Sequence, residues 1–154
     1  MKNAFTMIEL IWVIVILGIL SAVAIPRLAA TREDAQISKG ASQVAAIRSG
    51  IALQKSANLM QGNRQTNSYY PDNLDGVTTY NTTGQNLFYF SDGNVSNILE
   101  SPIRSVNDTN GRWVKTGVNV YDFQVGGGVN TFTYNSTNGT FNCTAGTDCT
   151  SLTQ

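Results

Sequence analysis

The sequence predicts an α+β fold in which a long N-terminal helix packs on a small antiparallel β-sheet. Residues 5–25 form an apolar run in which Glu9 is the one charged residue. Downstream, apolar residues recur at steps of three and four, which is typical of an amphipathic helix. After Met60 the chain becomes rich in Asn, Thr, Ser and Gly, and short aromatic and β-branched runs alternate with turn signals, which indicates strands.

The first half of the predicted helix is hydrophobic on all sides. A run of about 20 apolar residues, rising about 1.5 Å each, just spans the hydrocarbon core of a bilayer. The run is therefore predicted to be a membrane helix. Glu9 lies inside it, and an ionisable residue within a membrane segment is a functional-site hypothesis by default.

The second half of the predicted helix, residues 27–59, is amphipathic. We expect one helix over residues 5–59 with a bend near Pro26, which lacks an amide hydrogen, and a weak point at Gly18. The interspersed Arg32, Lys39, Arg48 and Lys55 are read as ordinary residues of the solvated side. The apolar stripe that should face the core comprises Ile37, Ala41, Val44, Ile47 and Ile51.

The globular head, residues 60–154, should contain several short strands. Residues 61–84 hold repeated turn signals and read as an irregular connection. With about 125 residues outside the membrane, the soluble part suffices for one small core. The expected strands are residues 86–90, 112–115, 118–125, 129–135 and 140–143.

Two glycine-containing turns predict that the last three strands form a meander. Residues 126–128 are all glycine, and Asn138-Gly139 favours a two-residue hairpin with positive φ at both positions. If the glycine loop includes Val129, Phe123 pairs with Phe132 and Tyr121 with Tyr134; a three-residue loop would set Phe123 opposite Thr131. We favour the aromatic register, which places all four rings on one face against the apolar stripe.

The N-terminus admits three interpretations. Thr6 and Glu9 fit a capping box, in which the two side chains satisfy free amides at a helix start. Alternatively, Lys2 and the following apolar residues form a secretory signal peptide, with a small-residue cleavage site at residues 22–24. In the third interpretation the chain is cut between Ala4 and Phe5, and the apolar helix is retained.

The string Ala4-Phe5-Thr6-Met7-Ile8-Glu9-Leu10, the short leader with Lys2, and Pro26 at the end of the apolar run resemble the N-terminus of type IV pilins and type II secretion pseudopilins. The resemblance covers about the first 30 residues and is specific. It implies that a prepilin peptidase removes residues 1–4 and methylates Phe5. It also implies that Glu9 pairs with the terminal amine of a neighbouring subunit.

One residue departs from this family pattern, since Ala4 stands where the family usually has glycine. Alanine is small, so cleavage is still expected. The family's filaments can also lose helicity before the matching proline, which would fall between Gly18 and Pro26 here.

The resemblance implies a structural protein with a leader (1–4), an assembly helix (5–26), an amphipathic continuation (27–59) and a head (60–154). Its partners would be copies of itself, other pilins, an inner-membrane assembly platform and the prepilin peptidase. It would begin as a single-pass precursor in a bacterial inner membrane, with its head in the periplasm, and end in a pilus. The alternatives are a pseudopilin of a type II secretion or DNA-uptake system and a membrane-anchored periplasmic binding module that does not polymerise.

The charge distribution separates the helix from the head. The formal net charge is zero, but five bases against two acids lie in residues 27–55, whereas residues 64–148 carry four bases and seven acids. A basic patch, which nucleic-acid binding by the head would require, is therefore not indicated.

Cys143 and Cys149 form a candidate disulfide near the C-terminus. An even cysteine count in an exported domain suggests one bridge, and many type IV pilins close a C-terminal loop in this way. A metal pair is the alternative, although the chain has no histidine to assist it. Some pseudopilins bind calcium in this loop, for which Asp148 is a candidate ligand, and Asn94 is a candidate for glycosylation.

No catalytic constellation stands out. Histidine is absent from the sequence, no Gly-rich phosphate loop is present, and the acids of the head are scattered. We therefore expect neither enzymatic activity nor a cofactor other than the calcium considered above.

Overall fold

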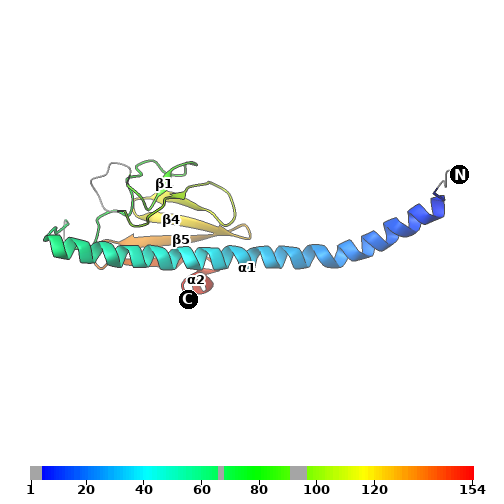
Figure 1. The fold of residues 1–154 in the computed structure, drawn as a ribbon, viewed down its shortest axis with the longest axis horizontal. Coiled ribbons are helices and arrows are strands. Elements are labelled where there is room, and N and C mark those ends of the chain that lie inside the picture. The colour runs from blue at the N-terminus through cyan, green and yellow to red at the C-terminus, as the bar shows by residue number, and fades with distance from the viewer. Residues whose placement is uncertain (1–4, 66–67, 91–96) are drawn as a thin grey trace. The chain divides into compact units, whose positions relative to one another are not determined.

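The computed structural model describes residues 5–65, 68–90 and 97–154, and it confirms the α+β fold. The chain divides into two compact units, Met1–Ala35 and Gln36–Gln154. The element order is α1, β1 to β6 and α2 (Figure 1).

Helix α1 comprises Met7–Gln61 and includes both Gly18 and Pro26 without interruption. It ends because Gly62 adopts a positive φ of 64°, a left-handed conformation that glycine tolerates. The amides of Gly62 and Asn63 donate to the carbonyls of Leu59 and Asn58, at 3.3 and 2.9 Å, which completes a Schellman motif. The loss of helicity expected in a filament concerns the assembled state and stays a prediction.

The sheet of the second unit is a four-stranded antiparallel meander. Its strands are β3 (Trp113–Gly117), β4 (Val120–Val125), β5 (Gly128–Asn135) and β6 (Thr140–Ala145), in the spatial order β3-β4-β5-β6. A separate antiparallel pair joins β1 (Asn86–Leu87) to β2 (Ile103–Arg104). The short helix α2 (Cys149–Leu152) follows β6.

The core of the second unit lies between α1 and one face of this sheet, as predicted. Val44, Ile47 and Ile51 of α1 are buried in one cluster with the inward side chains of the strands. Ring contacts join six aromatic side chains of this cluster, including Trp113 to Phe123 with centroids 4.9 Å apart. The buried aromatic residues are Phe88, Trp113, Tyr121, Phe123, Phe132, Tyr134 and Phe141.

The aromatic register predicted for β4 and β5 is wrong, although the predicted face is correct. Gly126 and Gly127 both have positive φ and form a two-residue turn, so Phe123 lies opposite Asn130 and Tyr121 opposite Phe132. The observed register differs from the favoured one by two residues. Because side chains alternate with a period of two, such a shift leaves all four rings on the inner face.

Three further strand predictions need correction. Residues 118–119 form the turn between β3 and β4, with Asn119 at a φ of 58°, instead of starting a strand. The loop between β5 and β6 contains four residues, and within its Asn138-Gly139 pair the positive φ belongs to Gly139. Strand β2 was not predicted at all.

Both edges of the meander accept hydrogen bonds from neighbouring segments. On β3, the carbonyls of Trp113 and Lys115 accept from the amides of Val106 and Asn81, at 3.0 and 2.8 Å. On β6, the carbonyl of Phe141 accepts from Nε of Arg48, at 3.1 Å. Loops thus border one edge, and a side chain of α1 borders the other.

Three cations of α1 are not ordinary residues of a solvated side, contrary to our interpretation of the sequence. Lys39 Nζ donates to the carbonyl of Gly111 at 2.7 Å, and Arg48 donates to Phe141 as described above. Lys55 Nζ donates to the hydroxyl of Tyr70 at 3.0 Å and lies 4.5 Å from the centre of that ring. Long side chains at the border of a helix stripe can lie along the core and place their charged ends on backbone carbonyls.

Candidate functional site

The N-terminal end of α1 holds the predicted assembly residue Glu9 in a capping box. The amide and the hydroxyl of Thr6 both donate to Oε2 of Glu9, each at 2.8 Å. In return, the Glu9 amide donates to Oγ1 of Thr6 at 3.4 Å. The local interpretation of this pair is confirmed, because each side chain satisfies a backbone amide that the helix leaves free.

The carboxylate of Glu9 retains capacity for other donors. An ionised carboxylate has about four lone-pair sites, and Thr6 uses two of them. Glu9 can therefore serve as the cap of its own helix and also accept hydrogen bonds from an ammonium group. Capping and pairing with a neighbouring chain are compatible roles.

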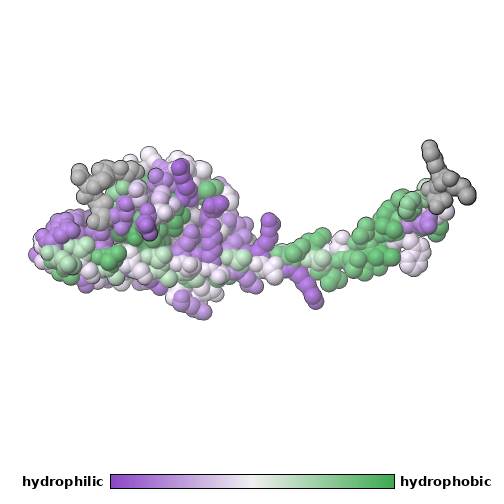
Figure 2. Space-filling model, in the orientation of Figure 1, coloured by the Kyte–Doolittle hydropathy of each residue, from purple (hydrophilic) through white to green (hydrophobic). Residues whose placement is uncertain are grey.

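The apolar side chains around this site are uncovered in the single chain. Phe5 is 85% exposed and Met7 80%, and the most apolar 18-residue window of α1 contains no buried residue. By length and composition this helix can cross a membrane. Figure 2 shows the resulting continuous apolar surface on the first unit. Such a surface requires lipid or another protein to cover it.

Two predicted residues lie outside the described part of the chain. They are Ala4, the last residue of the expected leader, and Asn94, the candidate glycosylation site. Phe5 is described and precedes the capping threonine.

The predicted disulfide is present between Cys143 and Cys149, whose Cα atoms lie 5.4 Å apart. Within the loop that it closes, Asp148 contacts β5. The amide of Asp148 donates to Oδ1 of Asn130 at 2.9 Å, and Oδ2 of Asp148 accepts from Nδ2 of Asn130 and from Oγ1 of Thr147, both at 3.1 Å. The bridge and the Asn130 contacts together fix the segment between β6 and α2.

Within the described residues, Asp148 belongs to no cluster of side chains that could form a metal centre. In residues 5–65, 68–90 and 97–154, no group of three or more His, Cys, Asp or Glu residues could hold a metal ion. The contacts of Asp148 are those of a residue that orders a loop.

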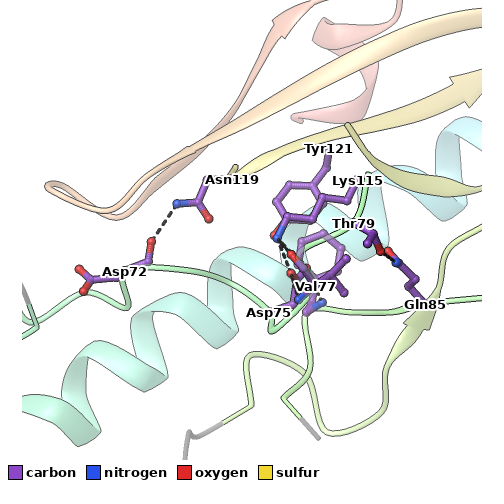
Figure 3. Close-up of polar contacts among 9 residues, drawn as sticks. Asp72, Asp75, Val77, Thr79, Gln85, Lys115, Asn119 and Tyr121 are labelled. Carbon is purple, nitrogen blue, oxygen red and sulfur yellow. Dashed lines mark hydrogen bonds and ion pairs between the residues drawn. The ribbon is translucent and has the colours of Figure 1, made fainter. Parts of the chain in front are cut away.

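A buried polar cluster around Asp75 was not predicted from the sequence (Figure 3). Its Oδ1 lies 2.6 Å from Lys115 Nζ and accepts from the Val77 amide at 3.1 Å, and its Oδ2 accepts from the Tyr121 hydroxyl at 2.9 Å. Lys115 Nζ also donates to the carbonyl of Val77 at 2.8 Å. The side chains of Asp75 and Lys115 are 0% and 4% exposed.

This cluster joins an irregular segment to the sheet. Burial raises the pKa of the Tyr121 phenol well above its usual range, and the adjacent Asp75 carboxylate adds to the effect, so Tyr121 remains a hydrogen-bond donor. Figure 3 also shows Asn119 donating to the carbonyl of Asp72, at 2.8 Å, and Gln85 donating to Thr79. The Asp75 cluster has the geometry of a structural clamp, since its buried groups are engaged with one another.

Comparison with known proteins identified no relative. No family model matches the chain, and the comparisons with curated proteins and with solved structures found no match.

Proposed function

We propose that this protein is a structural subunit of a type IV pilus-like filament, assembled through the first half of α1. One observation carries the proposal: the apolar first half of α1 is exposed, and it begins with a carboxylate, Glu9, that Thr6 caps without saturating it. The core lies within Gln36–Gln154, including the second half of α1, so the second unit does not need the helix residues before Gln36 to bury it. The helix is available for contacts with lipid first and with other copies afterwards.

Cleavage between Ala4 and Phe5 would create the partner for Glu9. The new amino group would start four residues before Glu9. A charge in the centre of a bilayer costs about 2.5–3.5 kcal/mol on insertion scales, and an ammonium and a carboxylate each offset part of the other's cost. A neighbouring copy, displaced along the helix axis, can satisfy both groups and thereby set the offset between subunits.

The partners and the location of this subunit would be those that the N-terminal resemblance implies. A prepilin peptidase would cut and methylate the precursor in a bacterial inner membrane, and an assembly platform would add subunits to the filament. The subunit would act by assembly and would catalyse no reaction. A pseudopilus is the short-filament version of the same assembly.

Mass spectrometry of the mature N-terminus tests the processing step. We expect a chain that begins at Phe5 and carries one added methyl group. A mature chain that begins at Ile25 would identify the segment as a secretory signal peptide and contradict the proposal.

Fibre yield tests the role of Glu9. Glu9→Ala in the full-length precursor should reduce sheared fibres, counted by electron microscopy, by at least about tenfold, because the unpaired amine of the neighbour then stays in hydrocarbon. Glu100→Ala removes an exposed carboxylate of the head and serves as the matched control, with a wild-type yield. Equal fibre yields from the Glu9 variant and wild type would remove the assembly role of Glu9.

A further inference from the structure

A cationic pocket lies on the second unit at the border of α1 and the sheet. It has a volume of about 290 Å³, and Lys39, Arg104 and Arg112 line it together with apolar atoms of Ile103 and Trp113. Trp113 is fully buried, and its indole Nε1 donates to Gln43 at 2.9 Å, so the wall that it forms is fixed. The pocket has a rigid apolar wall and three positive charges.

The charges of this pocket are not balanced by its lining. The residues that line it include no Asp or Glu. Partial burial lowers the pKa of Lys39, and the positive charge of Arg112 lowers it further. The three positive charges repel one another, which raises their electrostatic free energy. An anionic group that enters the pocket would therefore be stabilised by all three.

Two acids elsewhere on the chain have no basic residue at helical spacing to balance their negative charge. Glu33 and Asp34 are adjacent and exposed on α1 within the first unit. The positions three and four residues away from each hold Ala, Thr, Gln, Ile or Ser, so neither acid has an ion-pair partner at helical spacing. The salt bridge found in the described part of the chain joins Lys115 to Asp75 and involves neither of them.

We propose that the pocket formed by Lys39, Arg104 and Arg112 receives the Glu33-Asp34 pair of a second copy of this chain. The inference rests on the proposed function, since a filament is what presents one copy's helix to another copy's head. Such a contact is heterologous, because two different surfaces meet, and it therefore repeats along an open assembly. Complementary charges of this kind select the partner and the register more than they add affinity.

A charge swap in the full-length chain tests the contact. Arg104→Glu with Arg112→Glu leaves one cation against two acids in the pocket and should reduce fibre yield about tenfold. Glu33→Lys with Asp34→Lys places two lysines beside three cations and should do the same. Combining the four substitutions sets two lysines against a net acidic pocket and should restore the yield to within about threefold of wild type. The two arginine substitutions combined with Glu100→Lys are the matched control, which reverses an acid outside the pocket and should not restore assembly.

A zero-length carbodiimide cross-link in membranes separates this inference from the proposed function. Two differently tagged copies are co-expressed, and the carbodiimide should join Lys39 of one copy to Glu33 or Asp34 of the other. The product should be lost when Arg104→Glu and Arg112→Glu are combined.

Cross-linking in cells without fibres would support the pocket contact and contradict filament formation. Fibres that form normally in the variant with both arginine substitutions, without this cross-link, would overturn the pocket contact alone. Failure of both would overturn both, and phosphate that blocks the cross-link without affecting fibres would mark the pocket as an anion site only.

Discussion

At the scale of single residues, Asp75 shows how one buried carboxylate holds a loop to a sheet. It accepts hydrogen bonds from the side chains of Lys115 and Tyr121 and from the backbone amide of Val77. The ion pair spans 40 residues of sequence. Breaking such a pair leaves an uncompensated charge in the interior, which costs more than the intact pair contributes.

We expect Asp75→Ala to lower the free energy of unfolding by about 3–5 kcal/mol, because Lys115 stays buried without its partner. Chemical denaturation of the full chain in detergent, followed by near-UV circular dichroism, measures the change. Glu100→Ala, at an exposed position, is the matched control and should change stability by less than about 0.5 kcal/mol. If the two variants unfold alike, Asp75 is not a clamp.

The two buried tyrosines predict how stability depends on pH. Burial raises the pKa of Tyr121 and of Tyr134, whose hydroxyl donates to the carbonyl of Pro71 at 2.7 Å. Since tyrosines of the unfolded chain ionise near pH 10, the unfolded state loses protons above that pH that the folded state keeps. Stability should therefore be insensitive to these groups below about pH 9 and fall above about pH 10.

Tyr134→Phe isolates one contribution to this pH dependence. It should lessen the decline above pH 10 by about 1.4 kcal/mol per pH unit, since one fewer proton is then released on unfolding. Lys39 has the opposite effect on stability. Because its pKa is lowered in the folded state, the folded state loses this proton at a lower pH than the unfolded state, and this group makes stability rise with pH. Denaturant midpoints from pH 8 to 11.5 measure the slope; identical slopes for the variant and wild type would contradict the assignment.

At the scale of elements, the sequence predicted what depends on periodicity and missed what depends on distant partners. The stripe of α1 and the strand pattern of β4 and β5 repeat locally, so their faces follow from the residues. The register does not, because the three consecutive glycines allow more than one turn. Asn130 takes the position opposite Phe123, where Asp148 satisfies its buried amide group.

Contacts between residues close in sequence were also predictable at the candidate sites. Thr6 and Glu9 are three residues apart, and their hydrogen bonds follow from helix geometry, as does the proximity of the two nearby cysteines. Lys115 lies two residues after Trp113, so its inward position could have been predicted. Its partner could not, because Asp75-Gly76 has only the pattern of a turn.

Gly50 of α1 lies against the backbone of Ile98. A Cβ atom at this position would lie 2.0 Å from the carbonyl oxygen of Ile98. We expect Gly50→Ala to destabilise the protein by about 1–2 kcal/mol, because overpacking against backbone exceeds the helix propensity gained. Thermal unfolding measures the effect, and Gly18→Ala is the control, since no atom lies within 4 Å of its added Cβ. Stabilisation by both alanines would contradict a tight contact.

The Cys143–Cys149 bridge should contribute about 2 kcal/mol, as the chain-entropy model gives for so short a loop. Replacing both cysteines by serine should lower the free energy of unfolding by this amount and make the protein insensitive to reductant. Denaturation curves with and without dithiothreitol measure both effects. A reductant effect that persists in the double variant would show that it arises elsewhere.

At the scale of the whole molecule, burial differs sharply between the two units. The described cluster of buried apolar residues belongs to Gln36–Gln154, whereas residues 5–34 are exposed along the whole helix face. Folding of the second unit therefore has its own hydrophobic driving force. The first unit has none of its own and depends on what surrounds it.

A chain that begins at Gln36 should consequently fold and remain monomeric in buffer without detergent, whereas the full chain should partition into detergent. Sedimentation velocity and detergent phase separation measure the two behaviours. Retention of the near-UV circular dichroism of the full chain is the control for folding. A truncated chain that precipitates would show that the first unit also supports the core.

The bordered edges of the meander have a consequence for crowded heads. Exposed strand edges invite pairing with other sheets and thereby promote amyloid-like aggregation. Here outward carbonyls of β3 are occupied by Asn81 and Val106, and one of β6 is occupied by Arg48. In the filament that we propose, heads held at high local concentration would thus be discouraged from pairing through their strands, and the helices would determine how the copies are ordered.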